Sequence, residues 1–303
     1  MHSQGRHLFF HGSVRETNRS SITFLFLFLL SLVLVSAAGA ADERIIFLHH
    51  STGNIIYSDG DVPGWIADYN TTQNSAYLVQ DRYYPNTPYP WANYPYDYWN
   101  LWVNGSCRAD TPNIHCLDQL TADYQVVIFK NCFPVSNIGA DTGSPDITSS
   151  KKSLENYKLQ YSAVRDKLQE YPDTLFIFWT GAPLHRLATT PDKATRARQF
   201  ADWVKNEMVA GGSYPNIRVF DYFGLTAGTD NVLRYDYEKS HTGSDSHPNS
   251  QAATDVGPVF ARFIITSAQD FFDTPGSNQG NTQPSPNQNG KTPVPATALL
   301  LMK

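Results

Sequence analysis

The chain has 303 residues, a formal net charge of −5 and 41% hydrophobic residues. This length allows one large domain with a full core, or two small ones. The mild acidity provides no basic surface for a polyanion, so we expect no nucleic-acid partner.

Residues 1–40 have the pattern of a secretory signal peptide. Arginines precede an apolar run at 22–35, and Ala38-Gly39-Ala40 supplies small residues for cleavage. The run is shorter than the roughly 20 residues that a membrane-spanning helix needs. We therefore expect cleavage after Ala40, no stable membrane span, and a secreted or cell-surface location, extracellular or periplasmic in a bacterium. Retention of the segment as an anchor is the alternative.

The first segment of the predicted domain is a buried strand at 45–48, with the sequence Ile-Ile-Phe-Leu. Ser51 lies in the tight polar exit from this strand. In an open parallel sheet, ligands bind beyond the carboxyl ends of the strands, so Ser51 is a candidate nucleophile. The alternative is that Ser51 caps a helix that starts near Asn54, because serine is a preferred N-cap residue.

A stretch rich in proline and aromatic residues follows, at about 57–116. Because proline at this density disrupts strand pairing, we expect mostly loop, with one strand at 76–79. Aromatic side chains beside polar groups suit stacking on sugars, so Trp91, Trp99 and Trp102 are candidate substrate-binding residues. The alternative is that these side chains pack the loop onto the domain.

The chain contains three cysteines. Export would permit disulfides. Cys107 and Cys116 lie in one polar, irregular segment, and we expect them to be bonded to each other. Cys132 would then be free, and it is either a nucleophile or, as is more common for a free cysteine, a small buried hydrophobic residue.

Strand and helix patterns alternate through the rest of the domain. Apolar runs predict strands at 124–129, 174–179 and 217–221, and helical spacing predicts helices at 153–170, 190–210 and 252–271. Alternation of this kind is typical of a parallel sheet with right-handed crossovers. We therefore expect a three-layer α/β domain over 41–275, with helices on both faces of the sheet.

The carboxyl-terminal segment 276–303 is rich in Gly, Ser, Asn, Gln and Pro, a composition that predicts a disordered polar tail. From Pro293 onward it resembles the start of a truncated bacterial sorting signal of the exosortase type. The alternative is an ordinary frayed tail.

Candidate catalytic residues occur at the ends of three predicted strands. They are Ser51, Asn131, and the pair Asp245 and His247 before the final helix. A serine hydroxyl needs a neighbouring base before it becomes a good nucleophile. His247 can act as that base, and Asp245 can orient its ring. The side-chain amide of Asn131 is a suitable donor for an oxyanion hole.

In these residues and in their order, the chain resembles the SGNH (GDSL-like) hydrolase superfamily over about 44–272, as a divergent bacterial secreted branch. The blocks that carry the resemblance are 49–53 (His-His-Ser-Thr-Gly), 129–132 (Phe-Lys-Asn-Cys) and 245–249 (Asp-Ser-His-Pro-Asn). The resemblance implies a flavodoxin-like fold and ester hydrolysis through a Ser-His-Asp triad and an oxyanion hole. It implies no cofactor.

The chain departs from the family pattern at three places. His49-His50 replaces the usual Gly-Asp before the serine. Asp245 lies two residues before His247, whereas the family spacing is three, so a Ser-His dyad is the alternative to a triad. The oxyanion glycine of the family has no clear counterpart, and Gly105 is the candidate.

A metal site is the rival interpretation of the histidine-rich segments. His49, His50, Asp245 and His247 carry zinc-ligating groups, but adjacent residues on a strand point to opposite faces. We therefore expect no metal. His115, His185 and His241 have no recognisable partners in the sequence, and we expect ordinary loop or surface histidines.

The sequence thus predicts a secreted serine esterase. The aromatic stretch and the predicted export suggest O-acetyl groups on a polysaccharide as its substrate. The alternative is a non-catalytic carbohydrate-binding or cell-surface protein that retains the fold.

Overall fold

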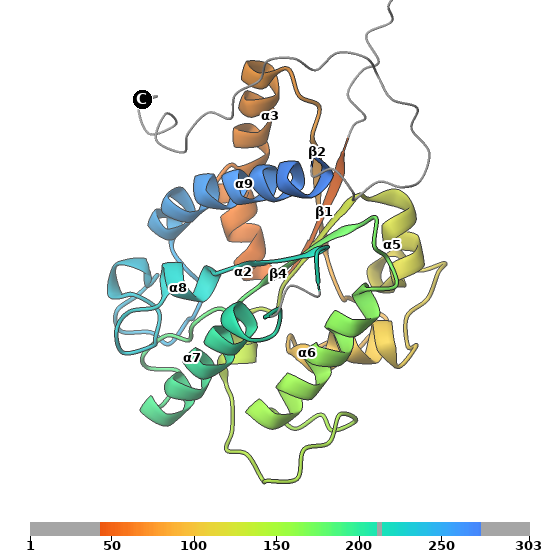
Figure 1. Ribbon diagram of the computed structural model, residues 1–303. Coiled ribbons are helices and arrows are strands. Elements are labelled where there is room, and N and C mark those ends of the chain that lie inside the picture. Colours follow the sequence, from red (N-terminus) through yellow and green to blue (C-terminus); the bar gives the residue numbers. More distant parts are fainter. Residues whose placement is uncertain (1–42, 211–213, 274–303) are drawn as a thin grey trace, which may run out of the picture. The chain divides into compact units, whose positions relative to one another are not determined.

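The computed structural model describes residues 43–210 and 214–273 (Figure 1). The predicted signal peptide at 1–40 and the predicted tail at 276–303 lie outside these residues. Within the described part, no helix is both long enough and apolar enough to cross a membrane.

The centre of the domain is a parallel sheet with the strand order β2-β1-β3-β4-β5. Its strands are β1 (Arg44–His49), β2 (Leu78–Tyr83), β3 (Val126–Phe129), β4 (Leu175–Trp179) and β5 (Ile217–Phe220). This is the flavodoxin-like order of a doubly wound sheet, in which β2 is added on one side of β1 and the later strands are added on the other, so that the strand order reverses between β1 and β3. The predicted α/β class and parallel sheet are confirmed.

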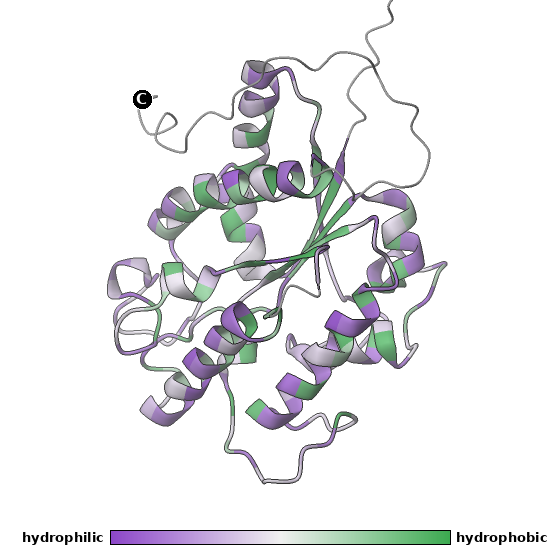
Figure 2. Cartoon of the chain, viewed as in Figure 1, coloured by the Kyte–Doolittle hydropathy of each residue, from purple (hydrophilic) through white to green (hydrophobic). Residues whose placement is uncertain are grey.

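Helices cover both faces of this sheet, because successive strand residues point to opposite sides. On β1, Ile46 and Leu48 join one core cluster, whereas Ile45 and Phe47 join the other. The first cluster lies under α5 (Leu117–Asp123), α6 (Leu154–Leu168) and α7 (Pro191–Asn206), and the second lies under α3 (Val62–Gln73) and α9 (Ser250–Phe272). Hydrophobic residues fill the strands, and hydrophilic residues line the outer faces of the helices (Figure 2).

Local capping signals explain where the long helices begin. The side chains of Ser153, Thr190 and Asn249 each accept a hydrogen bond from a backbone N–H in the first turn of α6, α7 and α9. The three predicted helices are therefore confirmed. The remaining helical segments are short: α2 (Ser51–Asn54), η1 (Ile55–Asp59), α4 (Pro95–Tyr98), η2 (Trp99–Val103), η3 (Pro112–Ile114), η4 (Phe133–Ser136), α8 (Tyr222–Thr226) and η5 (Tyr235–Tyr237).

The prediction for 57–116 was wrong in part. This stretch contains the twelve-residue helix α3, the continuous helical segment formed by α4 and η2, and a strand at Leu78–Tyr83 rather than at 76–79. Pro63 and Pro95 lie in the first turn of their helices, where a missing N–H costs nothing. Proline density therefore marked helix starts here as well as loops.

Two glycines allow α9 to pack closely against the segment that follows Ser51. A Cβ atom on Gly257 would lie 2.2 Å from the Gly60 carbonyl oxygen, and one on Gly60 would lie 2.6 Å from the Ala253 carbonyl oxygen. A side chain at either position would force the backbones apart. This contact fixes the end of η1 against α9, the helix that begins directly after the 245–249 block.

The predicted disulfide between Cys107 and Cys116 is confirmed, with a Cα–Cα separation of 5.0 Å. Cys132 is free and buried.

We expect thiol titration of denatured, unreduced protein to find one reactive thiol per chain. Reduction before titration serves as the control and should reveal all three cysteines. Three thiols in the unreduced sample would contradict the bridge.

Candidate active site

Ser51 lies at the carboxyl end of β1, where the chain turns directly into α2. His50 is extended, and Ser51 is the first helical residue. Gly53 makes this sharp turn possible, because a Cβ atom there would lie 2.4 Å from the Cβ of His49. Ser51 is therefore part of the helix rather than its cap, and its side chain stays half-buried at the carboxyl edge of the sheet.

The structure brings His247 and Asp245 to Ser51 in a continuous hydrogen-bonded row. The Ser51 Oγ and His247 Nε2 atoms are 2.7 Å apart. The His247 Nδ1 and Asp245 Oδ1 atoms are 2.6 Å apart. The same carboxylate oxygen accepts from the backbone N–H of His247 at 3.0 Å. This local turn lets a carboxylate two residues before the histidine reach its ring.

The partners of the His247 ring determine which nitrogen carries the proton. An ionised carboxylate only accepts hydrogen bonds, so Nδ1 donates to Asp245 and Nε2 is left to accept from the Ser51 hydroxyl. Burial acts to raise the pKa of Asp245, but the hydrogen bonds and charge of His247 outweigh it and leave that pKa below its usual value. Phe133 contacts the His247 ring edge-on, with ring centroids 4.8 Å apart.

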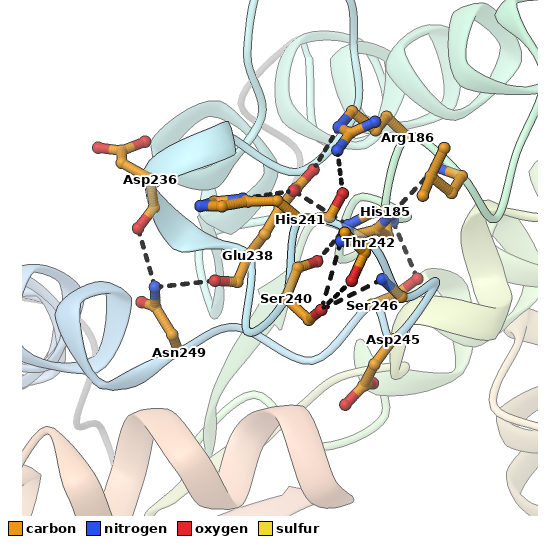
Figure 3. Close-up of polar contacts among 12 residues, drawn as sticks. His185, Arg186, Asp236, Glu238, Ser240, His241, Thr242, Asp245, Ser246 and Asn249 are labelled. Atoms are coloured by element: carbon orange, nitrogen blue, oxygen red, sulfur yellow. Dashed lines mark hydrogen bonds and ion pairs between the residues drawn. The ribbon is translucent and has the colours of Figure 1, made fainter.

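A second polar network holds the 238–249 segment in place (Figure 3). The carboxylate of Glu238 is fully buried, and it lies 3.1 Å from His185 Nε2 and 3.0 Å from His241 Nδ1. Arg186 Nε lies 3.2 Å from the other carboxylate oxygen. The backbone N–H of His185 donates at 2.9 Å to the Oγ of Ser246, the residue between Asp245 and His247. The network thus anchors the turn that carries Asp245 and His247.

His185 differs from the sequence expectation of a loop or surface histidine. It is completely buried, and its Nδ1 accepts from the backbone N–H of Leu187 at 3.0 Å. Its Nε2 faces the carbonyl of Ser240 at 3.1 Å as well as Glu238. The sequence offers no signal for this pairing, because Glu238 lies in a different loop, far along the chain.

Asn131 follows β3, the strand next to β1, and its side chain is buried. Its Nδ2 donates to the hydroxyl of Tyr161 on α6 at 2.5 Å. An amide group has two hydrogens to donate, so this bond uses half of the donor capacity of Asn131. A role for Asn131 in an oxyanion hole stays a prediction.

Gly105 is not supported as a second oxyanion donor. It lies in an exposed turn after η2, with open space where a Cβ would point. Asn93, which the sequence interpretation does not include, contacts a neighbour of Ser51: its Oδ1 accepts from the backbone N–H of Cys132 at 3.3 Å. Asn93 has a left-handed backbone, with φ of 60°, a conformation that asparagine tolerates.

Asp97 fixes that Asn93 turn. One of its carboxylate oxygens accepts from the backbone N–H groups of Ala92 at 2.9 Å and Asn93 at 2.7 Å. Burial raises the pKa of Asp97 to about 6, although these hydrogen bonds favour the ionised form. The turn is therefore held by a buried carboxylate.

The three tryptophans proposed to bind substrate have different positions. Trp99 and Trp102 are 5% and 4% exposed and pack in the core, so the prediction for them was wrong. Trp91 is 39% exposed, and its ring stacks on His50 with centroids 3.9 Å apart. Because His50 precedes Ser51 directly, only Trp91 of the three is available beside the site.

His49 and His50 face different partners. His49 Nε2 lies 2.9 Å from Asp81, whereas His50 Nε2 donates to the carbonyl of Pro85 at 2.8 Å. Burial lowers the pKa of His50 to about 4, so its ring is neutral under Trp91 at physiological pH. Among residues 43–210 and 214–273, no cluster of three His, Cys, Asp or Glu side chains could hold a metal ion.

Comparison with known proteins identifies no family model and no curated protein that match the chain. Similar solved structures include an acetyl xylan esterase, AlAXEase, at 14% identity and a TM-score of 0.43, with 73% of this chain and 98% of that chain covered. Another is the psychrotrophic esterase EstA from Pseudoalteromonas sp., at 11% identity and a TM-score of 0.40, covering 77% of this chain and 100% of that one. A carbohydrate esterase is similar at 11% identity and a TM-score of 0.36, covering 78% and 66%.

The buried network predicts a specific stability effect. Replacing Glu238 by Gln keeps the side-chain shape but removes the charge that faces His185, His241 and Arg186. We expect the free energy of unfolding, measured by urea denaturation, to fall by about 1–3 kcal/mol. The control is Asp236→Asn, two residues before Glu238, whose exposed ion pair with Arg234 should be worth less than about 1 kcal/mol. Equal effects in both variants would argue against the buried network as an anchor.

Proposed function

We propose that this protein is a serine esterase of the SGNH type. The observation that carries the proposal is the row from Asp245 through His247 to Ser51, with its 2.6 Å and 2.7 Å contacts at the carboxyl edge of the sheet. A protein that had kept the fold and lost activity would have no need to maintain this alignment. We therefore favour an enzyme over a non-catalytic carbohydrate-binding protein.

In the proposed mechanism, His247 Nε2 takes the proton of the Ser51 hydroxyl as its oxygen attacks the ester carbonyl. Asp245 keeps Nδ1 protonated and stabilises the imidazolium that forms. His247 then gives the proton to the leaving alcohol, and the acyl group remains on Ser51. A water molecule, deprotonated by His247 in the same way, releases the acid and restores the serine.

The negative oxygen of the tetrahedral intermediate needs donors placed before the reaction begins. The second hydrogen of the Asn131 amide is our candidate for one of them. Asn93 is the second candidate, because its side chain already contacts the backbone of Cys132 beside Ser51. Its buried turn, held by Asp97, would keep this amide in a fixed orientation.

The substrate that we propose is an ester on a sugar, such as an O-acetyl group of a polysaccharide. The support is Trp91, an exposed ring that stacks on the residue before Ser51. Aromatic faces bind the apolar face of a sugar ring, and the ester would then extend toward Ser51. Export through the segment 1–40 would bring the enzyme to such a substrate.

The triad assignment predicts large and non-additive losses of activity. Ser51→Ala, His247→Ala and Asp245→Asn should each lower kcat/KM for p-nitrophenyl acetate by at least about a hundredfold, since the change of the acid costs about 10⁴-fold in a well-studied serine protease. The double variant Ser51→Ala with His247→Ala should lose little more than either single variant, because the groups act as a unit.

The matched control is Ser58→Ala, an exposed serine on η1 just after the site, which should retain activity. Near-normal turnover in Asp245→Asn would show that another group orients His247. Full activity in Ser51→Ala would refute the esterase proposal.

The glycan assignment predicts a selective effect at Trp91. Trp91→Ala should lower kcat/KM on acetylated xylan oligosaccharides by about three- to tenfold, the range of one aromatic contact. Hydrolysis of ethyl acetate, whose alcohol has no ring, should change little. Trp91→Phe should restore most of the loss, and Trp65→Ala, an exposed tryptophan on α3, is the surface control. Equal losses on both substrates would show that Trp91 does not recognise the sugar.

A further inference from the structure

Cys132 lies directly beside the proposed nucleophile. Its Sγ is 3.5 Å from the Ser51 Oγ and 2.9 Å from the Thr52 Oγ1. Cys132 is 3% exposed, whereas Ser51, which its sulfur contacts, and His247, which contacts Ser51, are partly exposed. The proposed hydrolytic mechanism gives this sulfur no role.

Lys130, two residues before Cys132, is the second unexplained group. Its side chain is 1% exposed, and its Nζ has no hydrogen-bond partner. The stem passes under the Ser51 turn, where its Cδ would lie 3.1 Å from a Cβ on Gly53. The ammonium lies 5.8 Å from the centre of the Trp179 ring. A buried cation without a partner is costly, so burial lowers the pKa of Lys130, and the charge of the Cys132 sulfur acts in the opposite direction.

The surroundings of Cys132 favour a reactive thiolate. Burial acts to raise the pKa of the Cys132 thiol, but the charge of Lys130 and hydrogen bonds from Thr52 and Ser51 outweigh it and leave that pKa below its usual value. Thiolates beside a lysine are more readily oxidised than ordinary buried thiols. The same sulfur is therefore both activated and next to Ser51.

We propose that Cys132 is a site of reversible oxidation by peroxide, and that its oxidation blocks Ser51. The thiolate sulfur attacks one oxygen of hydrogen peroxide, so a sulfur–oxygen bond forms and the oxygen–oxygen bond breaks. Hydroxide leaves and takes a proton to become water. Sulfur is oxidised to a sulfenic acid by one electron pair, and the peroxide is reduced.

The position of the new oxygen explains the block. Only 3.5 Å separates Sγ from the Ser51 Oγ, so an added hydroxyl on sulfur reaches the serine and competes with His247 for its hydrogen bond. Cys107 and Cys116 are bonded to each other, so the chain has no further thiol to form a disulfide with the oxidised Cys132. The sulfenic acid then persists until an external thiol reduces it.

The experiment treats the purified protein with a modest excess of hydrogen peroxide and then with dimedone, which labels sulfenic acids. Mass spectrometry should find the adduct on the peptide that contains Cys132. Activity on p-nitrophenyl acetate should fall in parallel, and dithiothreitol given in place of dimedone should restore it. Cys132→Ala, normalised to its own untreated activity, should resist peroxide.

Two variants test the activation of the sulfur. Lys130→Met keeps the apolar stem and removes the charge, and it should slow labelling by at least about tenfold. Thr52→Val removes the hydroxyl at nearly constant volume and should also slow labelling, so it serves if the lysine variant does not fold.

The loss of hydrolysis depends on the proposed function, whereas the oxidation of Cys132 does not. An adduct on a protein without esterase activity would refute the function and leave the modification site standing. Labelling of Cys132 only after denaturation would overturn the inference. Equal loss of activity in the wild type and in Cys132→Ala would overturn it as well.

Discussion

The site depends on one constraint of the sheet: its strands run parallel, so their carboxyl ends meet at one edge. β1 and β3 are neighbours, which brings Ser51 and Cys132 together although they lie 81 residues apart in the chain. The remaining component comes from 196 residues away, when the loop before α9 brings His247 to the same edge. Without the parallel order, these side chains would lie at opposite ends of the sheet.

The close contact between Gly60 and Gly257 links α9, the helix after His247, to the helical segment that begins at Ser51. Through it, α9 packs directly on the segment that continues from α2, so the helix that starts after the His247 loop contacts the helical segment that starts at Ser51. The buried carboxylate of Glu238 holds the same loop from its other side through His185, Arg186 and His241. The loop is thus fixed by apolar packing at one end and by charge at the other.

The polar groups around Ser51 differ in their exposure to solvent. Asp245 and His247 are partly exposed and form a hydrogen-bonded pair beside Ser51. The amine of Lys130 and the sulfur of Cys132 are instead almost completely buried. Electrostatic interactions are stronger where water is excluded, so the buried pair influences the serine turn although neither side chain reaches the surface.

The sequence by itself determined the sheet class, the three long helices after residue 150 and the candidate catalytic residues, but not the helices within 57–116. Apolar periodicity is a local signal, so it predicted the sheet class and the long helices. The candidates Ser51, Asn131, Asp245 and His247 came from their places at the ends of predicted strands and from the resemblance to a known superfamily. Only the tertiary structure decided what depends on contacts between distant segments. It buried Trp99 and Trp102, left Trp91 exposed, paired His185 with Glu238, and placed the side chain of Asn93 against the backbone of Cys132. It also turned the backbone so that Asp245 reaches His247 across a spacing of two, a backbone geometry that residue identity alone does not specify.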